Sequence, residues 1–342
     1  IIWAMLISAV ATSTIITMAS NHWLLAWLGL ELNTLSILPI MMNRHHPRTS
    51  EATTKYFIIQ ALAAATILLA SSINAWTTGT WTIMQTTHPL ATALATIALM
   101  LKMGIAPAHL WYPDIMQGSA LMTAALVATW QKLAPLTLLY LMCPANPALI
   151  LTLAVSSAAV GGWAGLNQTQ TRKIMAFSSI AHMGWLLAAL TISPHLTTLT
   201  IMTYLIITTV TFITLEATQA KTIPDLSTTW TTSTPMTTTM LVLLLSLGGL
   251  PPLTGFMPKL LIAKELTLMN LLPLTIALLM ASLPSLYFYT RVAYSLTLTA
   301  PPTTLCNKMS WRTTQKPHQI IAPLALAAIM LLPLTPTLFN TT

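Results

Sequence analysis

A lysine lies inside an apolar run at residues 101–113, where the chain reads Leu-Lys-Met-Gly-Ile-Ala-Pro-Ala-His-Leu-Trp-Tyr-Pro. A lysine near the centre of a bilayer costs about 2.5–3.5 kcal/mol on insertion scales, so Lys102 indicates a function. Pro107 lacks a backbone N–H and interrupts the helix, which leaves carbonyl groups in need of partners at membrane depth. A charged side chain beside a broken helix is typical of an ion or proton site in a transporter.

The same pattern occurs a second time, near residue 250. Gly249, Pro252 and Pro258 have the same spacing as the glycine and the two prolines of residues 104–113, and Lys259 follows Pro258 directly. Glycine and proline are common in membrane helices, so one copy is weak evidence. Two copies, each with a lysine in apolar surroundings, indicate an internal duplication.

Two more ionisable residues fall deep in apolar stretches. Glu31 lies near the middle of residues 22–42, and Lys132 near the middle of residues 119–142. Together with Lys102 and Lys259, these groups are costly in a membrane unless they pair or titrate. A structural alternative is one salt bridge between Glu31 and a lysine that only fixes packing, but it leaves at least two lysines without an acidic partner. We therefore predict a proton relay, because a buried lysine can gain and lose a proton as a carboxylate approaches or withdraws.

Two histidines could connect the lysines of this relay. His109 lies in the first broken stretch, and His182 lies in an apolar helix beside two serines. Histidine titrates close to neutral pH and often carries protons. The alternative is that each imidazole only hydrogen-bonds to a neighbouring hydroxyl or carbonyl.

The composition is that of a membrane protein. Of 342 residues, 55% are hydrophobic and only 6% are charged. The net charge of +8 is not gathered into a basic stripe, so membrane lipids explain it better than nucleic acid does. Cys143 and Cys306 are too few for an Fe–S cluster or a zinc site, and we expect two free thiols. The small residues of 161–165 predict a close approach of two helices, since no strand precedes them to form a dinucleotide loop.

Apolar segments of membrane-spanning length recur along the whole chain. They predict an all-α polytopic protein with about eleven transmembrane helices in a single membrane domain, residues 1–342. The predicted helices cover residues 1–20, 22–42, 51–76, 89–112, 119–142, 147–166, 172–191, 196–217, 236–268, 271–298 and 319–338.

The two broken helices are the fourth and the ninth in this order. An offset of five reverses the direction through the membrane, so residues 1–142 and 147–298 would form an antiporter-like inverted repeat of five plus five helices, with 319–338 as an extra C-terminal helix. Almost every loop lysine and arginine then falls on the side of the N-terminus, which the positive-inside rule assigns to the matrix or cytoplasm.

Several longer stretches of the sequence resemble one known family. Residues 21–33, 51–57, 161–170, 172–185 and 247–259 are similar to mitochondrially encoded NADH dehydrogenase subunit 2 of vertebrate type. The resemblance covers essentially the whole chain, and its motifs are specific in combination.

The resemblance implies a proton-translocating, antiporter-like core subunit in the membrane arm of mitochondrial NADH:ubiquinone oxidoreductase (complex I). Glu31, Lys102, Lys132 and Lys259 match the family's relay residues, with His109 and His182 in supporting positions. The family binds no cofactor in this chain, because NADH, FMN, Fe–S clusters and ubiquinone belong to other subunits. The implied partners are neighbouring antiporter-like, small core and accessory subunits, together with lipids.

The implied location is the mitochondrial inner membrane, with the N-terminus and the basic loops in the matrix and the C-terminus in the intermembrane space. Two other functions stay open at this point. The chain could be a cation/proton antiporter subunit, whose motifs are physically hard to separate from these. It could also be a structural membrane-arm subunit that only anchors its neighbours.

Overall fold

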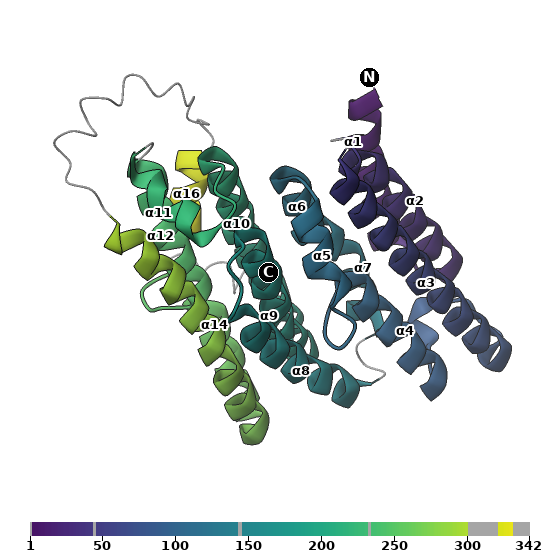
Figure 1. Cartoon of the computed structure of the whole chain (residues 1–342). Helices are drawn as coiled ribbons and strands as arrows, with labels where there is room; N and C mark the ends of the chain where they lie inside the picture. Colours follow the sequence, from purple (N-terminus) through teal and green to yellow (C-terminus); the bar gives the residue numbers. More distant parts are fainter. Residues whose placement is uncertain (1, 44–45, 143–145, 232–233, 300–320, 331–342) are drawn as a thin grey trace. The chain divides into compact units, whose positions relative to one another are not determined.

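A computed structural model describes residues 2–43, 46–142, 146–231, 234–299 and 321–330 of the chain (Figure 1). Within these residues the secondary structure is helical, and the only β-type pairs are two isolated bridges, His22 with Thr82 and Gln170 with Thr222. The prediction of an all-α fold is therefore confirmed for this part of the chain. Cys143 and Cys306 lie outside the described residues.

The chain divides into two compact units, Ile1–Ser157 and Ala158–Thr342. In the first unit, α3 contacts α2, α4 and α5, while α7 contacts α1, α2 and α4. The helices of this unit are α1 (Ile2–Ala19), α2 (Trp23–Met41), α3 (Pro47–Thr78), η1 (Ile83–Gln85), α4 (Pro89–Met103), α5 (Trp111–Gly118), α6 (Leu121–Ala128), η2 (Trp130–Lys132) and α7 (Leu133–Met142). The next helix, α8 (Pro147–Gly165), begins in the first unit and ends in the second.

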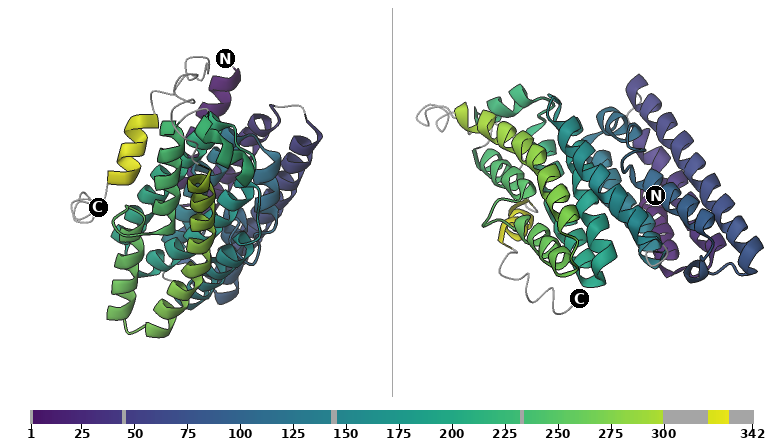
Figure 2. Two further views of the ribbon diagram at one scale, coloured as in Figure 1. Left: turned by 60° about the vertical axis from the view of Figure 1, so that its left-hand side comes forward. Right: turned by 90° about the horizontal axis from the view of Figure 1, so that it is seen from below.

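The second unit is built around α9. Of an 18-residue apolar stretch in α9, 89% is buried, compared with 22% of the corresponding stretch in α1. The helix α9 is therefore the core helix, and α1 presents most of its surface to the surroundings. The helices of this unit are α9 (Thr171–Ile192), α10 (Pro194–Thr218), α11 (Ile223–Thr228), η4 (Thr229–Thr231), α12 (Thr234–Gly248), α13 (Phe256–Leu268), α14 (Leu272–Leu298) and α16 (Ile321–Met330). The C-terminal helix α16, yellow in Figures 1 and 2, packs on α10 and α12.

Close packing in the second unit depends on small residues and on one arginine. A side chain at Gly161 would meet the backbone nitrogen of Ala181 at 2.5 Å, so α8 and α9 approach as the small residues predicted. Arg291 of α14 donates to the carbonyls of Leu166 and Gln168, at 2.5 and 2.8 Å, which no longer have partners within α8. These bonds tie the end of α8 to α14.

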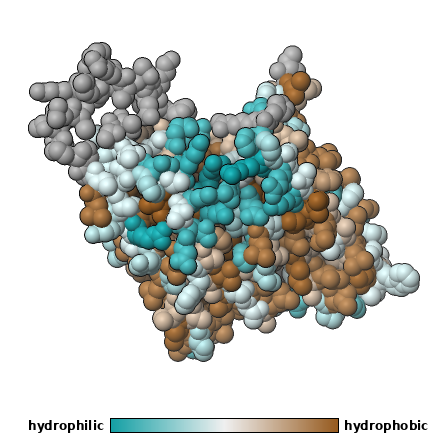
Figure 3. All heavy atoms as spheres, viewed as in Figure 1, coloured by the Kyte–Doolittle hydropathy of each residue, from teal (hydrophilic) through white to brown (hydrophobic). Residues whose placement is uncertain are grey.

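Eight described helical segments are long and apolar enough to cross a membrane. The shorter apolar helices α4, α12 and α16 supply three more segments, and each of these eleven segments overlaps one predicted range. Hydrophobic residues, brown in Figure 3, cover much of the helix surface on the face shown. The number of membrane crossings itself stays a prediction, as does the single membrane domain.

Three predicted helices are interrupted in the structure. The fourth ends at Met103, because Gly104 adopts a left-handed conformation with φ of 69°, and α5 forms separately after it. The ninth divides into α12 and α13 around Gly249, whose φ is 81°. The fifth, predicted at 119–142, is an apolar helical span at Leu121–Met142, but its middle is irregular, and it consists of α6, η2 and α7. Pro135 explains this third interruption, since its ring clashes with the carbonyl four residues earlier and it donates no hydrogen bond.

Candidate functional site

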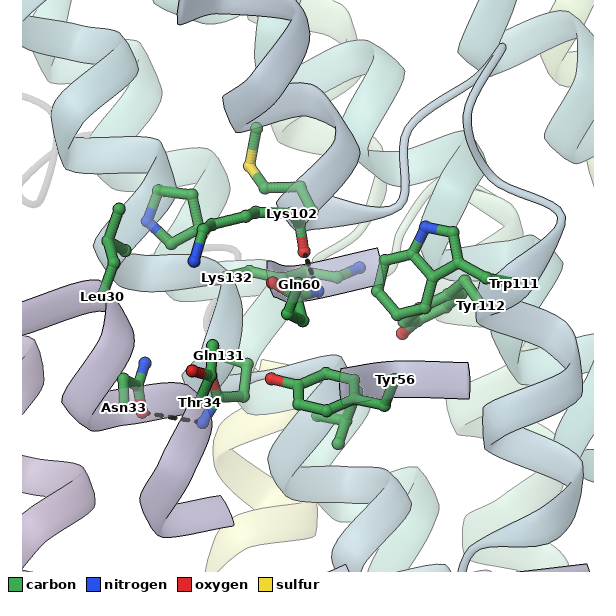
Figure 4. A pocket seen from close by; sticks show the side chains of 13 residues that line it. Leu30, Asn33, Thr34, Tyr56, Gln60, Lys102, Trp111, Tyr112, Gln131 and Lys132 are labelled. Atoms are coloured by element: carbon green, nitrogen blue, oxygen red, sulfur yellow. Dashed lines mark hydrogen bonds between the residues drawn. The ribbon is translucent and has the colours of Figure 1, made fainter. Parts of the chain in front are cut away.

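A small cavity of about 10 Å³ lies in the first unit, where α2, α3, α4, α5, α6, η2 and α7 meet (Figure 4). This volume is close to what one water molecule needs. Its lining is unusually polar for a helix bundle in a membrane. The polar and aromatic side chains that line it are Asn33, Thr34, Tyr56, Gln60, Lys102, Trp111, Tyr112, Gln131 and Lys132.

Lys102 reaches this cavity from the last turn of α4, one residue before the helix ends. Only 7% of Lys102 is exposed, and its Nζ has no hydrogen-bond partner among the described residues. The break also frees the carbonyl of Lys102, which accepts a hydrogen bond of 3.3 Å from Nε2 of Gln60 on α3. A charged amine without a partner is costly in such a site, so Lys102 is well placed to exchange a proton.

Lys132 enters the same cavity from η2, the interruption that the sequence did not predict. It is 4% exposed, and its Nζ lies 5.0 Å from the ring centroid of Tyr112. The neighbouring Gln131 donates from Nε2 to Oδ1 of Asn33 at 2.9 Å, which ties η2 to α2. The structure therefore brings Lys102 and Lys132 to one cavity.

Glu31 lies on α2, one turn before Thr34, and is half-buried. Its Oε2 accepts a hydrogen bond of 3.1 Å from the hydroxyl of Thr34, which is part of the lining. Glu31 interacts electrostatically with Lys102, but the two do not form an ion pair within 4 Å. The described residues therefore contain no direct Glu31–Lys102 salt bridge of the kind that would only fix packing.

His109 does not line the cavity. It lies in the loop between α4 and α5, half-buried, with Nδ1 3.2 Å from the carbonyl of Pro107. Its part in a relay stays a prediction.

Lys259 lies at the second break, in the first turn of α13. Its Nζ donates at 3.1 Å to the carbonyl of Gly248, the last residue of α12. A side chain at Gly249 would meet this amine at 3.1 Å, so glycine at this position leaves room for the lysine. At this break, the lysine amine and the carbonyl at the end of α12 are therefore hydrogen-bond partners.

His182 and Lys259 line two small cavities of the second unit, of about 30 and 10 Å³. The ring of Tyr204 lies 5.9 Å from that of His182, and the hydroxyl of Tyr289 lies 3.5 Å from its Nε2. The imidazole is thus held between two phenols beside the amine.

Sequence reasoning missed the tyrosines and amides of both sites. Tyr112, Tyr204 and Tyr289 were not distinguished from apolar packing residues, and Gln60 and Gln131 were passed over. An uncharged amide inside an apolar helix is itself a signal, because each buried polar group needs a partner. Among the described residues, no group of three or more His, Cys, Asp or Glu side chains could hold a metal ion.

Two family models match almost the full length of the chain. Residues 20–284 match the transmembrane family of NADH:quinone oxidoreductase and Mrp antiporters, and residues 286–339 match the C-terminus of NADH dehydrogenase subunit 2. Similar curated proteins are named NADH-ubiquinone oxidoreductase chain 2. The protein from Tetraodon nigroviridis is 52% identical over 95% of this chain and 94% of its own length, and that from Carassius auratus is 49% identical over 98% and 97%.

Solved structures agree with these matches. A chain of respiratory complex I from Thermus thermophilus, solved with bound aureothin, superposes with a TM-score of 0.85 and 26% identity, over 98% of this chain and 77% of that one. A chain of the Mrp complex from a Dietzia species shares the fold, with a TM-score of 0.81 and 16% identity over 98% of this chain and 74% of that one. These matches show that the chain belongs to the NADH-ubiquinone oxidoreductase chain 2 family, within the larger family of NADH:quinone oxidoreductase and Mrp antiporter membrane subunits.

Proposed function

We propose that the chain is a proton-translocating, antiporter-like subunit in the membrane arm of mitochondrial NADH:ubiquinone oxidoreductase. The names of its curated relatives and the match of residues 286–339 support this enzyme over a free-standing cation/proton antiporter. NADH oxidation and quinone reduction belong to other subunits in this proposal, and no redox cofactor binds here. Neighbouring membrane-arm subunits and lipids are the partners.

One observation carries the proposal: each unit holds a buried or half-buried lysine next to a helix break, and this lysine lines a small cavity together with other polar side chains. Packing alone gives no reason to hold an amine in such a place, because an apolar side chain of similar size would cost less. A group that has to change its protonation state needs this combination of burial and polar neighbours.

The proposed relay in the first unit is Glu31, Lys102 and Lys132. Glu31 would act through Thr34, whose hydroxyl both bonds the carboxylate and lines the cavity that holds the lysines. Movement of this carboxylate toward or away from Lys102 would favour or disfavour the charged amine. Lys132 would then receive the proton across the same cavity.

The proposed relay in the second unit is His182 and Lys259. They line the same cavities, and Tyr289 and Tyr204 hold the imidazole. Histidine changes its charge near neutral pH, so it can pass a proton to or from the amine. His109 would support the relay from the first break.

The two breaks favour the proposed inverted repeat of residues 1–142 and 147–298. Residues 104–110 separate α4 from α5, and residues 249–255 separate α12 from α13, so both breaks are seven residues long. Each begins with a glycine of positive φ. In the proposed orientation the N-terminus and basic loops face the matrix, and the C-terminus faces the intermembrane space of the inner membrane.

The test is Lys102→Met and Lys259→Met in the assembled complex, reconstituted in liposomes. Both variants should oxidise NADH with a soluble acceptor at the normal rate and lose most proton pumping per ubiquinone reduced. Lys264→Met is the matched control, since Lys264 is exposed on the same helix as Lys259. Normal pumping in both cavity variants, with normal assembly, would show that the chain is a structural subunit instead.

A further inference from the structure

The ring of Tyr112 contacts the amine of Lys132, and this contact has no role in the proposed relay. Its ring centroid lies 5.0 Å from Nζ of Lys132, and the two residues are 1% and 4% exposed. A lysine ammonium within about 6 Å of an aromatic face is attracted by the ring quadrupole, most strongly where water is excluded. The contact therefore favours the charged form of Lys132.

The other ionisable groups near Lys132 are few. Tyr56 from α3 and Lys102 from α4 line the same cavity, and Glu31 of α2 accepts a hydrogen bond from Thr34, which also lines it. The helix α6, which packs on η2, carries no ionisable side chain. Lys102 repels a second positive charge, so the face of Tyr112 works against this repulsion.

Tyr112 is carried by α5, a helix of eight residues that follows the break. A side chain at Gly104 would meet the Cβ of Tyr112 at 3.0 Å, so the glycine of the break also makes room for this tyrosine. So short a helix has little stability of its own, and the position of Tyr112 depends on what holds α5 against the bundle.

The helix α5 is held against α3 at three points. Asp114 accepts from Nζ of Lys55 at 3.2 Å, and the ring of Trp111 lies 6.1 Å from that of Tyr56. Gly118 lies so close to α3 that an added Cβ would be 2.6 Å from that of Ala52. The ion pair borders a polar cleft of about 220 Å³ and is half exposed, unlike the other two contacts.

In the proposed repeat, Asp114 and Lys259 occupy the same position of their helices. Asp114 is the fourth residue of α5, and Lys259 is the fourth residue of α13, the helix that follows the second break. One copy thus places the proton-carrying amine at this position, and the other places the carboxylate that fastens the helix.

We propose that Tyr112 is a positioning residue of the proton relay, whose ring holds Lys132 in its charged form, and that the Lys55–Asp114 ion pair keeps this ring in place. This inference rests on the proposed function. If α5 moves away from α3, the ring leaves the amine and Lys132 releases its proton. The exposed ion pair then adjusts a buried proton site through a single short helix.

The first test compares Tyr112→Leu with Tyr112→Phe in the assembled complex in liposomes, with proton pumping followed against pH. Phenylalanine keeps the aromatic face, and leucine removes it. In Tyr112→Leu, Lys132 should lose its proton at lower pH, so the alkaline limb of the pumping profile should move down by roughly one pH unit. The limb should stay in place in Tyr112→Phe. Matching profiles in the two variants would overturn the proposal.

The second test leaves the cavity untouched and also decides the matter if Tyr112→Leu does not assemble. Asp114→Asn should move the alkaline limb in the same direction by a smaller amount, and Asp114→Glu should restore it. An unchanged limb in Asp114→Asn would refute the role of the ion pair. If Lys102→Met abolishes pumping while Tyr112→Leu leaves the profile unchanged, this inference fails and the proposed function stands. Normal pumping in the lysine variants would remove the proposed function itself.

Discussion

Substitution of Gly249 by alanine at the second helix break tests whether proton pumping depends on the position of the Lys259 side chain. Gly249→Ala adds a Cβ that would lie 3.1 Å from Nζ and 3.2 Å from Cδ of Lys259. Comfortable contacts between such atoms are about 3.5–4.0 Å, so the lysine side chain has to move by roughly half an ångström. This movement weakens the 3.1 Å bond from its amine to the carbonyl of Gly248.

The expected effect has two parts of different origin. Gly249 has a φ of 81°, and a left-handed conformation costs a residue with a Cβ about 1–2 kcal/mol. A hydrogen bond to a charged group contributes about 1.5–3 kcal/mol, which is the upper limit for what the displaced amine loses. If the bond is broken, the population of correctly placed Lys259 falls about tenfold to a hundredfold. Pumping should fall with it, and ubiquinone reduction should lose its coupling to proton movement.

Gly79→Ala is the matched control for this substitution. Gly79 ends α3 with a φ of 71°, but an added Cβ meets nothing within 4 Å. Both variants therefore carry the backbone cost, and only Gly249→Ala displaces the lysine. The assay is proton pumping per NADH oxidised in liposomes, corrected for assembled complex on native gels. Equal pumping by the two alanine variants would refute the reasoning.

Three further predictions concern contacts elsewhere in the second unit. Thr254 donates to the carbonyl of Ala328 on α16, so Thr254→Val should loosen the C-terminal helix by about 1–3 kcal/mol, seen as faster hydrogen exchange in α16, while Thr254→Ser should retain it. Arg291→Leu leaves two carbonyls at the end of α8 without a donor and should reduce assembled complex several-fold on native gels, with Arg291→Lys giving an intermediate amount. His182→Gln should lower pumping at unchanged NADH oxidation with a soluble acceptor. His195→Gln, at an exposed position, should leave pumping unchanged, and an equal loss in both would contradict the assignment.

Much of the fold follows from local properties of the chain. Apolar length predicted the helical segments, and glycine followed by proline predicted the breaks at Gly104 and Gly249, both confirmed. Conformational preference and hydrophobicity act over a few residues, so they can be read without the partner helices. The break at η2 was missed because Pro135 lies inside an apolar segment that hydrophobicity alone treats as continuous.

Part of the candidate site could likewise be predicted from the sequence, and part could not. Glu31, Lys102, Lys132 and Lys259 stand out in the sequence because a charge in an apolar run is expensive wherever the run packs. Their partners do not stand out. A tyrosine in a membrane helix is ordinary, and only the packing shows which phenol lies against an amine or an imidazole.

By itself the sequence determined that this is a helical membrane protein with amines placed at two helix breaks, because burial energy and backbone geometry depend on local residue types. Only the tertiary structure decided that Gln60 caps the carbonyl freed at Lys102, that Tyr112 faces Lys132 and that Tyr289 reaches His182. These pairs come from different helices and are between 20 and 107 residues apart in the chain. Their contact depends on how helices pack, which no local pattern specifies.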